Sequence, residues 1–528
     1  MTAAQVKYVL AIDMGSGSVK ASVVSSNGEV AASGLRHMTM KIMAGGGAEH
    51  DPEEWWKAAC DAAREALKSA HIAPENVIAV ACTTLWSVTV PVDKDGNALG
   101  NAISWMDTRG GKYNRAISAG WPKVQGYALA KLIKWVRHTG GVPVLSGVDG
   151  LGHILFMKHE RPEMYARTYK FLEPMDYFNA RLTGQIAASY ATMFPYWLTD
   201  IRDPNRIDYV PELIAMAGLD RAKLPDLKPV DAILGTLKPE VAADLGLLPS
   251  TRVVMGAGDS HAATVGAGSV RDFQGYFYIG TTSWMSCHVP AKKIDPFHMM
   301  TAMPAALPGR YMISAEQGAA GRCIELLKDL LYSAGANTHD DVYADMNRLA
   351  AETAPGSDGL IFTPWINGVF APQEDVSTRS AFFNQTARTT RGHYVRAVME
   401  GVACNLRWVK RHVEKFIGRP FEQLNFIGGG ASSNLWSQIL ADVLGCPVRQ
   451  VANPRNANGV GAAMAAFAAL GEISIDDISS RVKIAVEYRP TEANRSVYDR
   501  QFHEFLAFYK ANRAIYRRLN PPASIRQG

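Results

Sequence analysis

The sequence lacks the short motifs that define several large enzyme classes. No segment matches GxxxxGK[ST], so any nucleotide is bound without a P-loop. The chain also contains no HExxH, no GxSxG and no HRD and DFG pair, which excludes zincins, α/β-hydrolases and protein kinases. The remaining candidates for chemistry are turns of small residues between apolar segments.

Cysteine is scarce and widely spaced. The six cysteines form no CxxC pair, which excludes a dense disulfide framework and a structural zinc site. We expect them to be buried free thiols in a reducing compartment. They are Cys60, Cys82, Cys287, Cys323, Cys404 and Cys446.

Long hydrophobic runs are also missing. The most apolar one, residues 461–470, is much shorter than a membrane span, which requires roughly 18 residues. The amino-terminal segment has no basic region, and Asp13 interrupts its apolar stretch, which argues against a secretory signal. We therefore expect a cytoplasmic globular protein.

Blocks of like charge are absent. The chain has 55 Lys and Arg against 50 Asp and Glu, a formal net charge of +5 spread over 528 residues. Because this surplus forms no basic face, we expect neither a nucleic-acid partner nor a membrane-surface partner. The length exceeds the roughly 250–300 residues at which single cores stop growing, and it predicts two large domains.

Strand and helix patterns alternate along the chain, which predicts an α/β protein. Residues 7–35 hold β-branched apolar runs separated by a small-residue turn and a Ser-Asn-Gly turn. Residues 274–289 repeat the order of strand, small polar turn and strand. The repetition and the length favour two α/β halves, residues 1–254 and 255–528, with a Pro-rich stretch before the boundary.

The first small-residue turn is DMGSGS, residues 13–18, followed by Lys20. Small residues let backbone N–H groups and hydroxyls approach phosphate oxygens, and a carboxylate such as Asp13 at a strand end can hold a hydrated Mg²⁺ ion. An ordinary tight hairpin with a turn-stabilising aspartate explains the same residues. The hairpin alone favours this second interpretation.

The second turn is GAGDSH, residues 256–261, which places Asp259 after an apolar strand among glycine and alanine. A general base for a hydroxyl must be ionised, close to its target and mounted where the substrate can approach. Asp259 meets the part of this requirement that a sequence can show. A role as a helix N-cap is the alternative, and the two roles are compatible.

Two further turns contain small polar residues. GTTS, residues 280–283, offers groups that can hydrogen-bond phosphate oxygens. GGGASSN, residues 428–434, follows an expected strand and opens an expected helix. It matches GxGxxS rather than the GxGxxG of a dinucleotide site, so this fingerprint is weak.

The order of these turns, hairpin, Asp turn, hairpin and Gly turn before a helix, resembles that of the FGGY family of carbohydrate kinases. Three other segments extend the resemblance over nearly the whole chain: SWMDTRG at 104–110, which resembles the family's W-x-D-x-R substrate segment, MDYFNARLTG at 175–184 and TRSAFFN at 378–384. The resemblance implies two actin-like, ribonuclease-H-like domains around a central cleft for ATP, Mg²⁺ and a sugar.

The resemblance also implies roles for single residues. It implies Asp259 as the catalytic base and Asp13 as the residue beside the metal ion. The ATP-binding residues that it implies are Ser16, Gly17, Ser18, Lys20, Gly280, Thr281, Thr282, Gly321, Gly429, Gly430 and Asn434. The expected acceptor-binding residues are Trp86, Ser87, Asp107, Tyr127 and Asp259.

The substrate signatures depart from those of well-known members of the family. This chain has Leu85-Trp86-Ser87-Val88 at the positions where xylulokinases have a segment that resembles Gln-Met-His-Gly. Glycerol kinases carry Arg-Glu at the positions of Trp86 and Ser87. Trp and Ser offer an apolar face and one hydroxyl in place of a charged or imidazole donor. A core role for Trp86 and a helical packing role for Tyr127 stay open. Residues 367–372, NGVFAP, also differ from the pentulose kinase stretch.

We therefore expect an ATP- and Mg²⁺-dependent, xylulokinase-like carbohydrate kinase that phosphorylates a hydroxyl of a small sugar, for example a pentulose such as xylulose. The alternatives are a glycerol- or erythritol-type polyol kinase, a non-catalytic actin-like ATP-binding protein and a dinucleotide-dependent oxidoreductase. The expected partner is a small-molecule sugar or polyol. The oligomeric state stays open, with a homodimer as one alternative.

Overall fold

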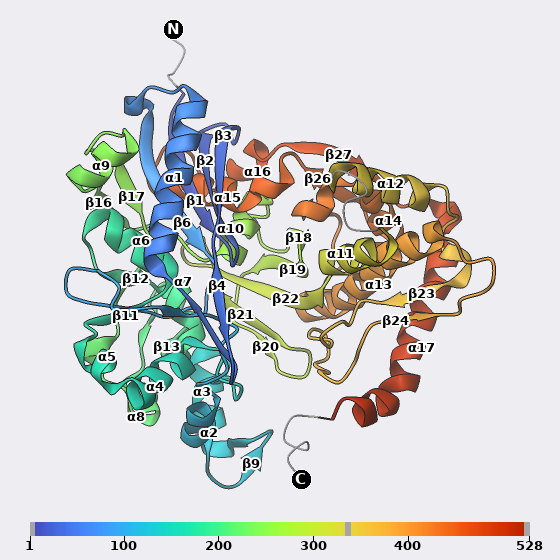
Figure 1. Cartoon of the computed structure of the whole chain (residues 1–528), viewed down its shortest axis with the longest axis horizontal. Helices are drawn as coiled ribbons and strands as arrows, with labels where there is room; N and C mark the ends of the chain where they lie inside the picture. Colours follow the sequence, from blue (N-terminus) through green and yellow to red (C-terminus); the bar gives the residue numbers. More distant parts are fainter. Residues whose placement is uncertain (1–5, 333–338, 522–528) are drawn as a thin grey trace.

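A computed structural model describes residues 6–332 and 339–521 of the chain. One large β-sheet lies in the amino-terminal half and a second in the carboxy-terminal half, with helices around both (Figure 1). This arrangement confirms the predicted α/β class. All six cysteines are buried and free, as expected.

The first sheet has six strands in the order β16-β17-β6-β1-β2-β3. Its central strand β1 (Tyr8–Met14) pairs antiparallel with β2 (Ser18–Ser25) and parallel with β6 (Val77–Thr84). The other strands are β3 (Val30–His37), β16 (Ile233–Thr236) and β17 (Arg252–Val254).

The second sheet has eight strands in the order β20-β21-β22-β19-β18-β25-β26-β27. Its central strand β18 (Gly275–Ile279) pairs antiparallel with β19 (Thr282–Val289) and parallel with β25 (Leu424–Ile427). The other strands are β20 (Ile294–Asp295), β21 (Met300–Pro304), β22 (Tyr311–Ala319), β26 (Val448–Val451) and β27 (Ile484–Tyr488).

The two sheets repeat one topology. The order β16-β17-β6-β1-β2-β3 corresponds to β27-β26-β25-β18-β19-β22, and each pair of neighbours has the same parallel or antiparallel sense in both sheets. The duplication predicted from the two hairpins is therefore confirmed. Each hairpin lies at the centre of its own sheet.

Each sheet carries a long helix inserted before its first parallel strand. In the first half this helix is α1 (Pro52–Ala70), and in the second half it is α13 (Arg391–Ile417). Helix α1 lies against β2 and β3 with an alanine-rich buried face. The approach is close because β3 has Gly34 at the contact, where a Cβ atom would lie 2.3 Å from the carbonyl oxygen of Ala62.

Helices α10 (Asp259–Gly266) and α15 (Ala457–Ala469) cross where the two halves meet. A Cβ atom on Gly266 would lie 1.8 Å from the carbonyl oxygen of Ala457, and one on Gly461 would lie 1.8 Å from that of Ala262. The backbones are therefore in direct contact. Since α15 also packs on β1 and β6, this crossing joins the second half to the first sheet.

Smaller elements surround the two sheets. The other helices of the first half are α2 (Gly111–Ser118), α3 (Leu129–Thr139), α4 (Gly150–Glu160), α5 (Pro162–Arg167), α6 (Pro174–Thr183), α7 (Tyr190–Met193), α8 (Pro211–Ala217) and α9 (Pro239–Leu245). Its short strands are β4 (Met40–Met43), β5 (Gly47–His50), β7 (Val90–Val92), β8 (Ala102–Ile103), β9 (Lys123–Val124), β10 (Tyr127–Ala128), β11 (Lys170–Leu172), β12 (Ala187–Ser189), β13 (Thr199–Asp200), β14 (Asp208–Tyr209) and β15 (Asp226–Lys228). The second half adds α11 (Gly321–Leu331), α12 (His339–Ala351), α14 (Asn434–Leu444), α16 (Ile478–Arg481), α17 (Arg495–Leu519), β23 (Ile361–Thr363) and β24 (Ala381–Phe383).

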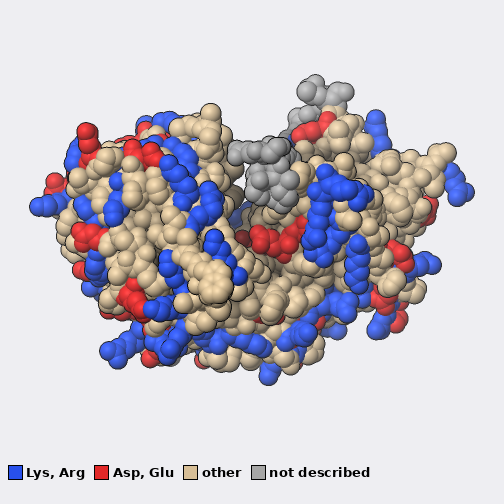
Figure 2. Space-filling model, turned by 90° about the horizontal axis from the view of Figure 1, so that it is seen from below, with Lys and Arg blue, Asp and Glu red and all other residues tan. Residues whose placement is uncertain are grey.

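The surface is hollowed between the two halves. Figure 2 shows two lobes separated by this hollow, with acidic side chains inside it and Lys and Arg side chains along its walls. None of the helices within residues 6–332 and 339–521 is long and apolar enough to cross a membrane.

Candidate active site

The first hairpin places Asp13 and Lys20 side by side. The two residues are cross-strand partners in the register of β1 and β2. Burial raises the pKa of Asp13 to about 6, while the charge of Lys20 and a hydrogen bond from Asn458 in α15 oppose this rise. The ammonium group of Lys20 donates to the carbonyl oxygen of Arg455 at 2.6 Å. The hairpin therefore reaches across to the second half of the chain.

Asp259 is the first residue of α10, and Gly258 occupies the N-cap position. The carboxylate accepts a hydrogen bond from the backbone N–H of Ser260 at 2.6 Å. It does not cap the helix, so the N-cap alternative is wrong. Burial raises the pKa of Asp259 to about 7, with additional contributions from the negative charges of Asp13 and Glu316. A carboxyl group with this pKa is matched to proton transfer near neutral pH.

The second hairpin forms a tight loop between β18 and β19. The backbone N–H of Gly321, at the start of α11, donates to the carbonyl oxygen of Gly280 at 2.8 Å. The backbone N–H of Ala320 donates to the carbonyl oxygen of Thr281 at 3.0 Å. A Cβ atom on Gly321 would lie 2.3 Å from the oxygen of Gly280. The loop and the helix start are thus locked together, which unites Gly280, Thr281, Thr282 and Gly321.

The Gly-rich turn GGGASSN, residues 428–434, adjoins this loop. Gly430 lies beside the last residue of β18, because its Cβ atom would be 2.8 Å from a methyl group of Ile279. A Cβ atom on Gly429 would meet nothing within 4 Å, so this glycine borders open space. Asn434 begins α14, and its side-chain oxygen accepts from the amide of Gln450 at 3.3 Å. The structure therefore brings the loop of residues 280–282 and the Gly-rich turn together.

Trp86 and Ser87 follow β6 and lie next to the start of α10. The Cβ atom of Trp86 is 3.8 Å from the position of a Cβ atom on Gly258. Ser87 adopts a positive φ of 62° and donates from its hydroxyl to the carbonyl oxygen of Val148 at 3.2 Å. Trp86 is half-buried and packs against a buried apolar cluster that includes Phe194, so the structure gives its ring a packing role as well. Its ring is therefore adjacent to the backbone that carries Asp259.

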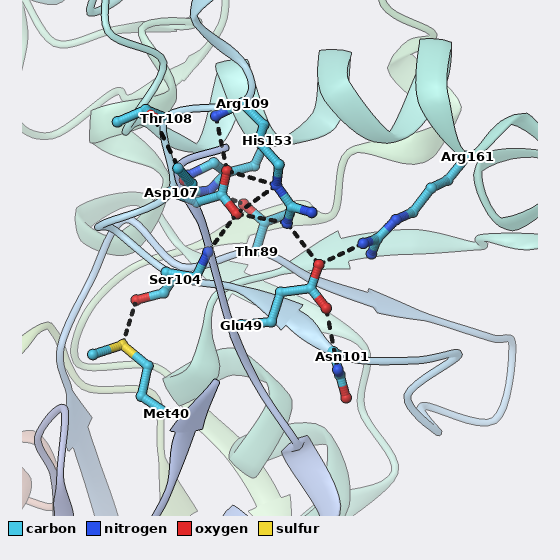
Figure 3. A network of polar contacts seen from close by, with 12 residues as sticks. Met40, Glu49, Thr89, Asn101, Ser104, Asp107, Thr108, Arg109, His153 and Arg161 are labelled. Carbon is cyan, nitrogen blue, oxygen red and sulfur yellow. Dashed lines mark hydrogen bonds and ion pairs between the residues drawn. The ribbon is translucent and has the colours of Figure 1, made fainter. Parts of the chain in front are cut away.

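Asp107 belongs to a buried network of polar side chains (Figure 3). Its carboxylate accepts from the backbone N–H of Ala48 at 2.9 Å and forms an ion pair with Arg109 at 2.6 Å. Glu49 binds Arg109 at 2.6 Å and Arg161 at 2.5 Å. Both oxygens of Asp107 are thus engaged within the protein. The expected contact of Asp107 with a sugar stays a prediction, and it would require this ion pair to open.

Tyr127 lies in β10, immediately before α3. Its hydroxyl donates to the carbonyl oxygen of Pro143 at 2.8 Å. Burial and the charge of Asp149 raise its pKa to about 12. Tyr127 is therefore neutral and already bonded, and its contact with a sugar also stays a prediction.

Several contacts of the site could not be predicted from the sequence. Trp105 in the W-x-D-x-R-like segment donates from its indole N–H to the hydroxyl of Ser16 at 3.2 Å, which connects this segment to the first hairpin. Tyr278 stacks on Trp284 with ring centroids 3.9 Å apart. The negative charges of Asp13 and Asp259 contribute to the raised pKa of Tyr278, so this ring lies near both carboxylates. Glu316 is the register partner of Trp284. An alternating sequence pattern shows which side chains of a strand share one face of the sheet. It does not show which strand is the neighbour in that sheet.

A duplicated α/β topology with two central hairpins and a hollow between the halves defines a two-domain actin-like kinase fold. The chain belongs to the FGGY family of carbohydrate kinases. The family's N-terminal domain matches residues 8–266, and its C-terminal domain matches residues 275–470. It is therefore a phosphotransferase with an alcohol group as acceptor, and the oxidoreductase and non-catalytic alternatives are set aside.

Similar proteins differ in the substrates that their names state. An autoinducer-2 kinase from Enterobacter sp. (strain 638) is 28% identical over 525 residues, covering 95% of this chain and 94% of that protein. A xylulose kinase from Staphylococcus epidermidis is 24% identical over 512 residues, covering 96% and 98%. The crystal structure of a gluconate kinase from Lactobacillus acidophilus matches with a TM-score of 0.83 at 21% identity, covering 98% of this chain and 100% of that one. The substrate is therefore unresolved by similarity.

Proposed function

We propose that this kinase transfers the terminal phosphoryl group of ATP to a hydroxyl of a small sugar, a pentulose such as xylulose, with Asp259 as the general base. One observation carries the proposal. Asp259 is half-buried at the start of α10, within the electrostatic influence of Asp13 and Glu316, and its pKa is about 7. A carboxylate there can accept the proton of the attacking hydroxyl at physiological pH.

The two hairpins would hold the nucleotide phosphates from opposite sides. Ser16, Gly17, Ser18 and Lys20 belong to the first hairpin, and Gly280, Thr281, Thr282 and Gly321 to the second loop. The end of β18 lies close to the first hairpin, since Asp13 influences the pKa of Tyr278. The adenosine would lie against Gly429, which borders open space, and against Gly430 and Asn434 of the same turn. Phosphoryl transfer depends mainly on such positioning and charge stabilisation.

We propose that a Mg²⁺ ion binds beside Asp13. Within the described part of the chain no three His, Cys, Asp or Glu side chains cluster closely enough to hold a metal by themselves. Mg²⁺ commonly uses one or two carboxylates and takes its other ligands from water and phosphate oxygens. The raised pKa of Asp13 indicates that Lys20 and Asn458 do not fully offset the cost of burying its negative charge. When bound, the ion would neutralise charge on the phosphates.

On the acceptor side we propose that Trp86 and Ser87 contact the sugar. Asp107 and Arg109 would hold the segment that carries Trp105, and Trp105 would connect the acceptor side to the hairpin through its hydrogen bond with Ser16. A contact between Tyr127 and the sugar is part of the same proposal. The glycerol- or erythritol-type alternative has no better support than the pentulose.

The test is ADP release from MgATP over a panel of ketoses, polyols and glycerol. Release with a pentulose above the level of acceptor-free hydrolysis is the expected outcome. No release with any acceptor would contradict the proposal. The domain boundary between residues 254 and 255, a homodimeric assembly and a cytoplasmic location stay predictions.

A further inference from the structure

One wall of the site beside Asp259 is aromatic and uncharged. The ring of Trp86 stacks with Phe194 at a centroid distance of 6.4 Å and meets His261 edge-on at 5.8 Å. His261 donates from Nε2 to the carbonyl oxygen of Pro304 at 2.9 Å, an atom that can only accept. Burial lowers the pKa of His261 to about 4, so the imidazole is neutral at physiological pH. Phe194 and His261 are buried, so of these three rings the half-buried Trp86 alone presents a surface, and it carries no charge.

The sheet next to Asp259 also presents rings. Tyr278, Trp284 and Glu316 are register partners across β18, β19 and β22 and so share one face of the sheet. Tyr276 lies on the same face two residues before Tyr278, and its hydroxyl donates to the carbonyl oxygen of Ser260 at 3.1 Å. This face is therefore turned toward the start of α10. The indole N–H of Trp284 is occupied, because it donates to the hydroxyl of Tyr276 at 3.0 Å.

The charges around the base are negative. The carboxylates of Asp13 and Glu316 both act on Asp259. In the described residues no Lys or Arg forms an ion pair or side-chain hydrogen bond with Asp259 or Glu316. Arg109, the cation of the W-x-D-x-R-like segment, is held by Asp107 and Glu49 (Figure 3). A carboxylate on the acceptor would therefore be repelled by Asp13 and Glu316, while Lys20, the cross-strand partner of Asp13, offsets part of this repulsion.

We infer, on the basis of the proposed function, that the acceptor is an uncharged polyhydroxy compound with an apolar end, a methyl or deoxy carbon, which packs against Trp86. A hydroxyl at that end would exchange its hydrogen bonds with water for contact with the Trp86 ring, which is unfavourable. A methyl group there gains free energy from burial instead. We expect sugar acids to be weaker acceptors, because Asp13 and Glu316 add negative charge near Asp259.

The test compares three acceptors of related shape: xylulose, its 1-deoxy counterpart and gluconate. The kcat/KM for ADP release is measured with each, and binding to the wild-type chain without ATP is measured by calorimetry. We expect the deoxy sugar to exceed xylulose roughly tenfold in both measurements, since one methylene-sized difference in an apolar pocket changes kcat/KM by about 10–200-fold. Gluconate should show the lowest value. Equal or tighter binding of xylulose or gluconate would overturn the inference, as would no binding of any of the three.

Two variants assign the preference to its residues. Trp86→Ala should remove the deoxy preference, and Trp86→Phe should retain it. Trp121→Ala is the matched control, because the Trp121 side chain is 92% exposed, and it should leave the preference unchanged. Glu316→Gln should raise the affinity for gluconate relative to xylulose. A deoxy preference that survives Trp86→Ala would overturn the role of Trp86. Absence of ADP release together with selective binding would instead contradict the proposed function and leave the inference supported.

Discussion

The negative charge of Asp13 raises the pKa of Asp259, although Asp13 lies in the first strand of the chain and Asp259 begins the helix that follows β17. The fold brings the two carboxylates together because β1, β6 and β17 are parallel neighbours in one sheet. The ends of parallel strands meet at the same edge of a sheet, where α/β proteins commonly bind ligands. Burial adds the larger part of the shift.

The pH dependence of the reaction should reveal the effect of Asp13 on the pKa of Asp259. The kcat/KM should rise with pH through about 7, because Asp259 must lose its proton to act as a base and burial and Asp13 raise its pKa to that value. Asp13→Asn removes a negative charge and should move this limb to lower pH, even though the maximal rate also falls. The measurement is the pH profile of ADP release from pH 5 to 9. A limb at the same pH in both proteins would contradict the coupling.

Thermal stability should rise when the buried charge is removed. The pKa of Asp259 is raised from 3.8 to about 7 in the folded chain, so its ionisation destabilises the fold as pH rises through this interval. Asp259→Asn should therefore melt at a higher temperature than the wild type at pH 8, and this advantage should shrink at pH 5. The control is Asp61→Asn, because ion pairing with Lys57 and Arg64 lowers the pKa of Asp61. That variant should show no such gain.

Two glycines should respond differently to alanine. Gly321→Ala places a Cβ atom 2.3 Å from the oxygen of Gly280, so the loop of residues 280–282 must shift and both thermal stability and MgATP affinity should fall. Gly429→Ala meets nothing within 4 Å, so it should leave the melting temperature unchanged. A loss of MgATP affinity in Gly429→Ala would then report a contact with the nucleotide itself. Unchanged MgATP binding in both variants would contradict the assigned site.

The network around Asp107 should be sensitive to the loss of Arg109. The Arg109 and Glu49 side chains are 17% and 5% exposed, and Arg109→Ala leaves Glu49 and Asp107 without this partner. We expect a loss of about 3–5 kcal/mol in the free energy of unfolding, measured with a chemical denaturant. Lys57→Ala removes a pair whose lysine is 78% exposed and should cost roughly 0–1 kcal/mol. A similar small effect in both variants would show that the buried pair is not structural.

The duplication of the fold could be predicted from the sequence because each hairpin has a local signature. The small-residue turn after Asp13 and the GTTS turn separate apolar strands, and both lie at the centres of their sheets. The sequence also predicted that Asp259 follows a buried strand. The sequence left open whether Asp259 caps the helix, and the structure assigns the N-cap to Gly258 instead.

The pairing of distant side chains could not be predicted. Asp107 meets Glu49 through the shared partner Arg109, and this contact depends on how β5 and β8 pair. The row formed by Tyr278, Trp284 and Glu316 depends on strand register, which the strand patterns do not determine. The acceptor site that we propose depends on these contacts.

The most direct test of the proposed function is the turnover of Asp259→Asn, measured as ADP release with MgATP and the best acceptor, together with MgATP affinity by calorimetry. The variant keeps the size of the side chain and removes its ability to accept a proton. We expect kcat to fall by roughly 10²–10⁴-fold, the contribution typical of a general base, while MgATP affinity stays nearly unchanged. Turnover close to that of the wild type would contradict the assignment of Asp259 as the base.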